Sequence, residues 1–87
     1  MTPPTPVPDG EIVVRYWASA RAAAGVVEER HRAATVGAAL DAAGQAHPSL
    51  APILAVATFL LDGRAVLRAE PTPPGSVLEV LPPFAGG

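Results

Sequence analysis

The feature that most constrains the fold is one helical segment set among short runs typical of β-strands. Apolar side chains recur at helical spacing through residues 36–47 and form a single stripe: Val36, Ala39, Leu40, Ala43 and Ala46. Thr35 is suited to cap the first turn, and Pro48 ends the segment because proline cannot continue a helix. A helix with a single apolar stripe is buried against one apolar surface and exposes its other side to solvent. We therefore expect one main helix lying across one face of a sheet.

The strands of that sheet are predicted on both sides of the helix. The runs with strand character are residues 11–17, 26–31, 55–61, 64–67 and 77–81. The first two are expected to pair as a hairpin, with one turn of helix between them that ends at Gly25. Asp62-Gly63 fits a tight turn between the third and fourth. This order predicts the α+β class, with a mixed sheet of four to five strands.

Three parts of the chain are expected. Residues 1–10 hold four prolines and few apolar side chains, so they predict a disordered, proline-rich N-terminal extension. The folded domain is predicted over residues 11–81, and residues 82–87 should form an extended C-terminal tail ending in Gly-Gly. A chain of 87 residues is long enough for only one domain.

Composition excludes several classes of function. The net charge of −2 argues against nucleic-acid binding, which a basic face usually supports. The sequence holds no cysteine, which excludes disulfides and thiolate metal sites. We see no secretory signal and no apolar run of membrane-spanning length, so a cytoplasmic location is expected and no membrane partner. All six basic side chains are arginines, so an activated C-terminal acyl group would find no ε-amine on its own chain.

The end of the chain carries the strongest chemical signal. Gly86 and Gly87 lack a Cβ and can enter a tunnel too narrow for other residues, while Pro82 and Pro83 stiffen the arm behind them. Such an arm would present the α-carboxylate of Gly87 to an activating enzyme. A frayed terminus is the plain alternative, because glycine is common at disordered ends.

Together these motifs resemble the small subunit of molybdopterin synthase, a sulfur carrier of the MoaD/ThiS family with a ubiquitin-like β-grasp fold. The residues that carry the resemblance are Tyr16-Trp17-Ala18-Ser19-Ala20-Arg21 with Gly25, Thr35-Val36 with Leu40, and Gly75 ahead of residues 77–87 (VLEVLPPFAGG). Three positions depart from the family pattern. Ala22 replaces a frequent glutamate, Pro74-Gly75-Ser76-Val77 replaces an acidic loop, and Asp62 stands where an asparagine is common.

The resemblance implies a two-step activation of Gly87. A ubiquitin-activating-like adenylyltransferase would use ATP and Mg²⁺ to adenylate the α-carboxylate. A sulfur donor, such as a persulfide-carrying desulfurase or rhodanese, would then displace AMP and leave a thiocarboxylate. This chain would bind no cofactor itself and would supply no catalytic side chain.

The resemblance also implies the partner and the roles of the tail. The tail would enter the large subunit of molybdopterin synthase, in a heterotetramer, and give its sulfur to cyclic pyranopterin monophosphate to form the dithiolene. Gly87 would carry the sulfur, and Gly86 would pass a narrow channel. Pro82, Pro83, Phe84 and Ala85 would hold and anchor the arm, although Phe84 could instead fold back on its own domain.

Other interpretations stay open. The sulfur could serve thiamin, cysteine or tRNA thiolation. The chain could be a ubiquitin-like modifier whose Gly87 forms an isopeptide bond, or a binding module whose tail has no chemistry. Arg21 is expected to brace the loop after the first strand.

Side chains outside the tail offer no site. His31 and His47 are sixteen positions apart, so no metal site is expected, and His47 fits a favourable cation at a helix end. Glu28 and Glu29 are expected to form a solvated pair.

Overall fold

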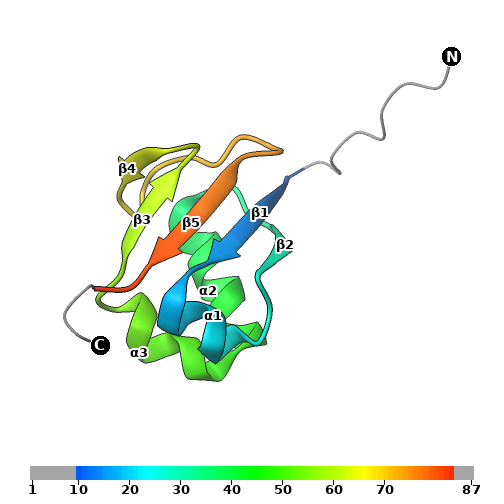
Figure 1. The fold of residues 1–87 in the computed structure, drawn as a ribbon. Coiled ribbons are helices and arrows are strands. Elements are labelled where there is room, and N and C mark those ends of the chain that lie inside the picture. The colour runs from blue at the N-terminus through cyan, green and yellow to red at the C-terminus, as the bar shows by residue number, and fades with distance from the viewer. Residues whose placement is uncertain (1–9, 84–87) are drawn as a thin grey trace, which may run out of the picture.

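Five strands form one mixed sheet in the spatial order β2-β1-β5-β3-β4 (Figure 1). The computed structural model describes residues 10–83. The elements in chain order are β1 (Glu11–Tyr16), α1 (Ala18–Ala24), β2 (Glu28–Arg32), α2 (Val36–Ala46), the 3₁₀ helix η1 (Pro48–Leu50), α3 (Ala51–Leu54), β3 (Thr58–Leu61), β4 (Arg64–Val66) and β5 (Val77–Leu81). β1 and β5 are parallel, and the other neighbouring strands are antiparallel. The predicted α+β class and the four to five strands are confirmed.

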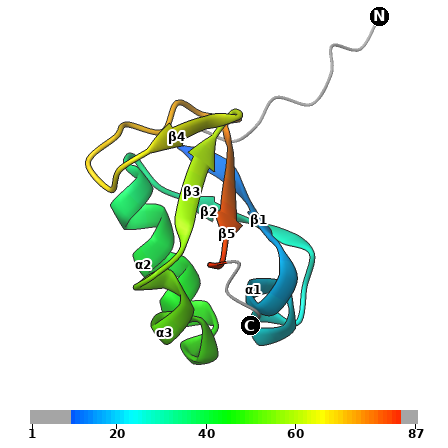
Figure 2. The same ribbon diagram turned by 60° about the vertical axis from the view of Figure 1, so that its left-hand side comes forward.

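The core lies between the sheet and the helices. Alternate residues of each strand point to opposite faces, and the inward set on β1 and β5 is fully buried: Ile12, Val14, Tyr16, Leu78 and Val80. α2 meets this layer with Val36, Ala39, Leu40 and Ala43, which are buried, and it crosses the sheet on its far side in Figure 1. Figure 2 shows the same helix from the side.

α2 matches its sequence prediction closely because its signals are local. The Thr35 hydroxyl accepts a hydrogen bond from the Ala38 amide at 3.1 Å, as expected of an N-cap. The helix ends at Ala46, one residue before the predicted end, and four of the five stripe residues are buried. Ala46 is exposed, so its place in the stripe was predicted wrongly.

The segment after Pro48 differs from the prediction. Residues 55–61 were expected to form one buried strand, but β3 begins only at Thr58. The chain first forms η1 and α3, and Leu50 is fully buried from there. A short apolar run has no period that separates a helix from a strand, which explains the error.

The remaining connections follow the sequence. Gly25 ends α1 in the left-handed region at φ 76°. Asp62 and Gly63 take φ 49° and 83° and turn β3 into β4, which glycine and aspartate tolerate better than other residues. β2 pairs with β1 as an antiparallel hairpin partner, although it starts at Glu28 rather than at residue 26. No helix in the described part of the chain is long and apolar enough to cross a membrane.

Candidate functional site

The base of the C-terminal tail leaves the middle of the sheet. β5 lies between β1 and β3, where Val80 pairs with Tyr16 and with Phe59, and Leu81 pairs with Thr58. β5 is therefore paired on both sides up to Val80, and its final residue Leu81 is paired with β3 alone. The residue from which the tail starts is therefore held in a fixed position by the sheet.

The two prolines end the strand. Proline has no backbone N–H, so the ladder cannot continue beyond Leu81. Pro82 is half-buried and Pro83 is exposed, so the described part of the chain ends at the surface. The predicted tail residues Phe84, Ala85, Gly86 and Gly87 lie outside the described residues, and their predicted roles stay predictions.

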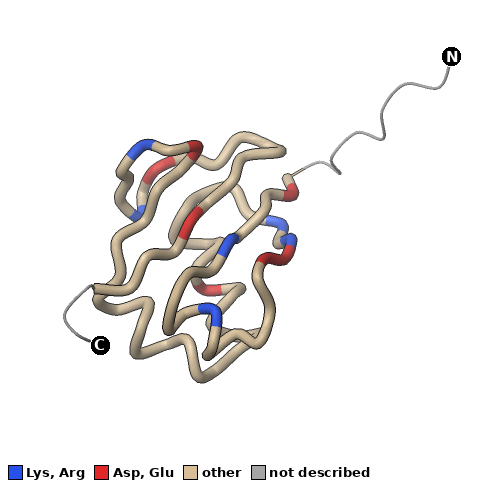
Figure 3. Tube along the Cα trace, viewed as in Figure 1, with Lys and Arg blue, Asp and Glu red and all other residues tan. Residues whose placement is uncertain are grey.

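The sheet face opposite the helices adjoins this exit. Its central positions are mixed. Val13, Leu60, Val77 and Leu81 are apolar and half-buried, and Glu79 in the middle of β5 lies among them, opposite Arg15 on β1. Around them lie charged groups, including the Arg15–Glu28 ion pair at 3.0 Å. Figure 3 shows acidic and basic positions interspersed over the molecule rather than gathered in one field. A face that combines half-buried apolar side chains with charged groups is compatible with a protein–protein interface.

Trp17 forms a corner where β1 meets α1, beside the tail exit. Its backbone amide donates to the Val80 carbonyl at 3.3 Å, and its indole N–H donates to the Glu79 carboxylate at 2.9 Å. The Arg21 guanidinium lies 5.4 Å from the centre of the indole ring, in cation–π contact. Arg21 also donates to the Tyr16 carbonyl at 3.3 Å, so it does brace the loop after the first strand. Trp17 remains 40% exposed and extends the apolar surface next to the tail.

The start of β5 is fixed by Asp62, which departs from the family pattern, and by Gly75, which keeps it. The Asp62 carboxylate accepts a hydrogen bond from the Val77 amide at 2.9 Å. Gly75 takes φ 84°, and its amide donates to the Glu11 carbonyl at 2.9 Å. The turn glycine and the acceptor at position 62 therefore still position the last strand, although the acidic loop is missing.

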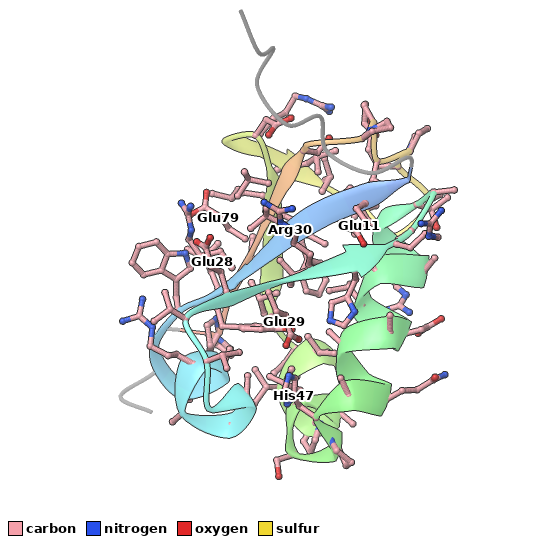
Figure 4. All side chains as sticks on the ribbon, turned by 90° about the vertical axis from the view of Figure 1, so that its right-hand side faces the viewer. Glu11, Glu28, Glu29, Arg30, His47 and Glu79 are labelled. Atoms are coloured by element: carbon pink, nitrogen blue, oxygen red, sulfur yellow. The ribbon has the colours of Figure 1, made fainter. Side chains whose placement is uncertain are left out.

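A second cluster lies on the helix side, around Glu29. Its carboxylate accepts hydrogen bonds from the Tyr16 hydroxyl at 2.6 Å, from His31 at 2.8 Å and from His47 at 2.8 Å. In Figure 4, Glu29 and His47 lie together on one side of the sheet, and Glu28 and Glu79 lie on the other. The prediction of a solvated Glu28–Glu29 pair is wrong for Glu29, because neighbouring strand residues face opposite sides and only Glu28 faces outward.

Ionisation in this cluster follows its contacts. Burial alone would raise the pKa of Glu29, but hydrogen bonds from Tyr16, His47 and His31 outweigh it, and the pKa lies below its usual value. Burial, followed by the hydrogen bond to Glu29 and its charge, strongly raises the pKa of the Tyr16 hydroxyl. The cluster therefore holds a carboxylate and a neutral phenol over the pH range of a living cell.

Some of these site residues could be found from the sequence. Trp17 and Arg21 belong to the motifs that carry the resemblance, and Asp62 was noted as a departure from the family pattern. The bond from Trp17 to Glu79, however, joins residues 62 positions apart. Nothing in the local pattern linked Glu29 with His47. Within residues 10–83, no three His, Cys, Asp or Glu side chains are arranged to hold a metal ion.

Comparison with solved structures identifies the fold. The small archaeal modifier protein SAMP1 from Haloferax volcanii superposes with a TM-score of 0.81 at 31% identity, over 90% of this chain and 100% of that one. Subunit 1 of a molybdopterin converting factor from Pyrococcus furiosus gives 0.77 at 26% identity, over 85% and 98%. A complex of subunits 1 and 2 of the Helicobacter pylori factor gives 0.67 at 23% identity, over 88% and 99%, which bears on the fold alone.

Comparison by sequence gives the family. No curated protein gave a significant match. The sequence profile of the ThiS family matches residues 14–87, which include the second half of β1, the other four strands and the Gly-Gly end. The chain therefore belongs to the ThiS family of ubiquitin-like β-grasp sulfur carriers.

Proposed function

We propose that this chain is the sulfur-carrier small subunit of a molybdopterin synthase and that it acts in the cytoplasm. The observation that carries most weight is the exit of the tail from the central strand. Leu81 is held by β3, the two prolines end the ladder there, and a sheet face with half-buried apolar side chains lies alongside. This is the arrangement expected of a body that docks by one face and delivers a terminal group on an arm.

The chemistry takes place at the α-carboxylate of Gly87. A carboxylate is a poor acyl donor, because its leaving group would be an oxide. Attack of the carboxylate oxygen on the α-phosphorus of Mg-ATP releases pyrophosphate and gives an acyl adenylate. A persulfide sulfur then attacks the acyl carbon and AMP leaves. Reductive cleavage of the S–S bond by a thiol leaves the thiocarboxylate. ATP and Mg²⁺ belong to the activating enzyme, and this chain binds neither.

The thiocarboxylate then serves as the nucleophile. Its sulfur forms a bond to a carbon of cyclic pyranopterin monophosphate in the large subunit, and an oxygen substituent leaves that carbon with the bonding electron pair. Water then hydrolyses the resulting acyl–sulfur bond, which leaves the sulfur on the pterin and returns Gly87 to the carboxylate. One half of the dithiolene is formed in each cycle. The side chains of this protein take no part in these bond changes.

Docking is assigned to the outward face of the sheet. Val13, Val77 and Leu81 would pack on the large subunit, and Trp17 would extend the contact toward the tail. Phe84 would anchor the arm in an apolar pocket of the partner, Pro82 and Pro83 would keep it extended, and Ala85 and Gly86 would fit a narrow channel. The Helicobacter pylori complex of two converting-factor subunits supplies a precedent for such a pairing.

A ubiquitin-like modifier is the second candidate, because SAMP1 is described as a small archaeal modifier protein. In that case Gly87 would be joined to an amine of a target protein. A carrier for thiamin, cysteine or tRNA thiolation would use the same activation with a different sulfur acceptor.

One appended residue tests the carrier chemistry. Adding an alanine after Gly87 moves the α-carboxylate out of place and should abolish cofactor synthesis in cells that depend on this protein. The same alanine added before Met1 is the matched control and should have no effect. Cofactor synthesis by the C-terminally extended chain would show that Gly87 is not the site of transfer. Recovery of the native chain in covalent conjugates would favour the modifier.

A further inference from the structure

Glu79 lies at the centre of the outward sheet face, which the proposed function assigns to docking. It belongs to β5, the central strand, and pairs with Arg15 on β1 and with Leu60 on β3. Val77 and Leu81 lie two positions before and after it and share its face, because successive strand residues alternate between faces. A half-buried carboxylate is therefore set among apolar side chains that a partner would cover.

Within residues 10–83, only Trp17 is bonded to this carboxylate. Its indole N–H donates to Oε2 of Glu79 at 2.9 Å. No ion pair among these residues includes Glu79, and its Oε1 accepts no hydrogen bond from them. A carboxylate can accept about four hydrogen bonds, so most of its capacity is left to water. Figure 4 shows Glu79 with Glu28 on the side of the sheet away from His47.

The arginines on this part of the face do not neutralise Glu79. Nε of Arg15 donates to Glu28 at 3.0 Å. The row Glu28–Arg15–Glu79 across β2, β1 and β5 therefore holds two carboxylates and one guanidinium. Arg30 lies on the edge strand β2, two strands from β5 and roughly 10 Å away across the sheet. One negative charge of the row is left without an ion-pair partner in the described part of the chain.

Docking changes the surroundings of Glu79 from water to protein. A buried carboxylate is strongly unfavourable unless it is paired and hydrogen-bonded. A partner with apolar side chains alone could pack on Val77 and Leu81, but it would remove the water from Glu79 and offer no donor in its place. A guanidinium replaces the lost bonds, because its planar fork donates two N–H groups to one carboxylate.

We propose that Glu79 is a specificity-determining residue of the docking face, and that the large subunit bears an arginine that pairs with it in the complex. This inference rests on the proposed function and adds the chemistry by which the partner is selected. A surface without this cation is rejected, because it would bury an unpaired charge. Trp17 is a positioning residue, whose indole N–H holds the carboxylate in place before the partner binds.

Calorimetric titration of the full chain into the large subunit from the same organism tests this pairing. Glu79→Gln removes the charge but keeps the size and an acceptor for the Trp17 indole, and it should weaken binding about thirtyfold or more. Glu79→Leu should weaken binding at least as much, because the arginine is then buried without a partner. Glu28→Gln is the matched control, since it makes the same change at the rim of the same face, and it should alter Kd by less than about threefold.

Charge reversal identifies the group on the partner. Glu79→Arg should abolish binding, and one variant of the large subunit should restore it when each of its exposed arginines is replaced in turn by glutamate. Circular dichroism should show the native fold in every variant at position 79, because this side chain lies on the surface of the sheet. Trp17→Phe should weaken binding by the native chain more than by Glu79→Leu, because the indole N–H acts through the carboxylate.

Unchanged or tighter binding by Glu79→Leu would overturn the inference, because it would show that an apolar surface covers this position. The absence of any restoring variant for Glu79→Arg would also overturn it. So would an Arg15→Gln background in which Glu79→Gln no longer changes Kd, because Arg15 would then be the cation that pairs with Glu79. Failure of the proposed function would look different: the native chain itself would not bind the large subunit, and the inference would fall with it.

Discussion

Replacing Glu29 by alanine should destabilise the fold far more than the same change at Glu28. The Tyr16 hydroxyl would lose its partner in a fully buried site, which costs about 1–3 kcal/mol. His31 and His47 would also lose bonds to a charged acceptor, but both are partly exposed and can bind water instead. The total should be about 2–4 kcal/mol.

Glu28 is the matched control because it is the preceding residue on the same strand. Its carboxylate is 46% exposed and makes one ion pair with Arg15, so Glu28→Ala should cost at most about 0.5 kcal/mol. Urea unfolding measures both free energies, and Glu29→Ala should lower Tm by about 8 °C or more.

A double-mutant cycle identifies the cause. Tyr16→Phe should cost about 1 kcal/mol in the native background and much less in the Glu29→Ala background, because its partner is already gone. The reasoning is refuted if Glu29→Ala and Glu28→Ala cost the same, or if Tyr16→Phe costs the same in both backgrounds.

Three further outcomes are expected. The pKa of Glu29 is lowered in the folded protein, so the stability that Glu29 contributes is present above its unfolded pKa of about 4.3 and is lost as the pH falls through its folded pKa. The difference in unfolding free energy between the native protein and Glu29→Ala should therefore shrink in acid. A difference that does not change with pH would contradict this. Thr35→Ala should cost about 1 kcal/mol by removing the α2 cap and Thr35→Ser should restore most of it, whereas equal losses would assign the effect to packing. Gly86→Val should leave the unfolding curve unchanged but stop sulfur transfer, and normal turnover would exclude a narrow channel.

Elements fixed by local signals were predictable from the sequence. The cap, stripe and proline stop gave α2 to within one residue, and Asp62-Gly63 gave the β3–β4 turn. The segment after Pro48 was not predictable, because whether Leu50 and the residues beyond it form a helix or a strand depends on what they pack against.

The candidate site likewise has one part that could be predicted from the sequence and one part that could not. The exit of the tail from β5 followed from a strand that runs directly into Pro82. The Glu29 cluster did not, because its partners lie 13 and 18 positions away and meet only once β1, β2 and the end of α2 are in place. The burial of Glu29 would have followed if its side chain could have been placed on the inward face of the strand. Residues 26–31 alternate too weakly between apolar and polar for the sequence to show which face that is.

The central claim is that Gly87 carries sulfur, and the mass of the C-terminal tryptic peptide tests it most directly. The last trypsin site follows Arg68, so the peptide is residues 69–87. It excludes Met1, the only methionine, whose oxidation would closely mimic the exchange of oxygen for sulfur. Protein isolated from its own cells should contain this peptide with one oxygen replaced by sulfur. A peptide found only as the carboxylate, even after incubation with the activating enzyme, Mg-ATP and a sulfur donor, would contradict the claim.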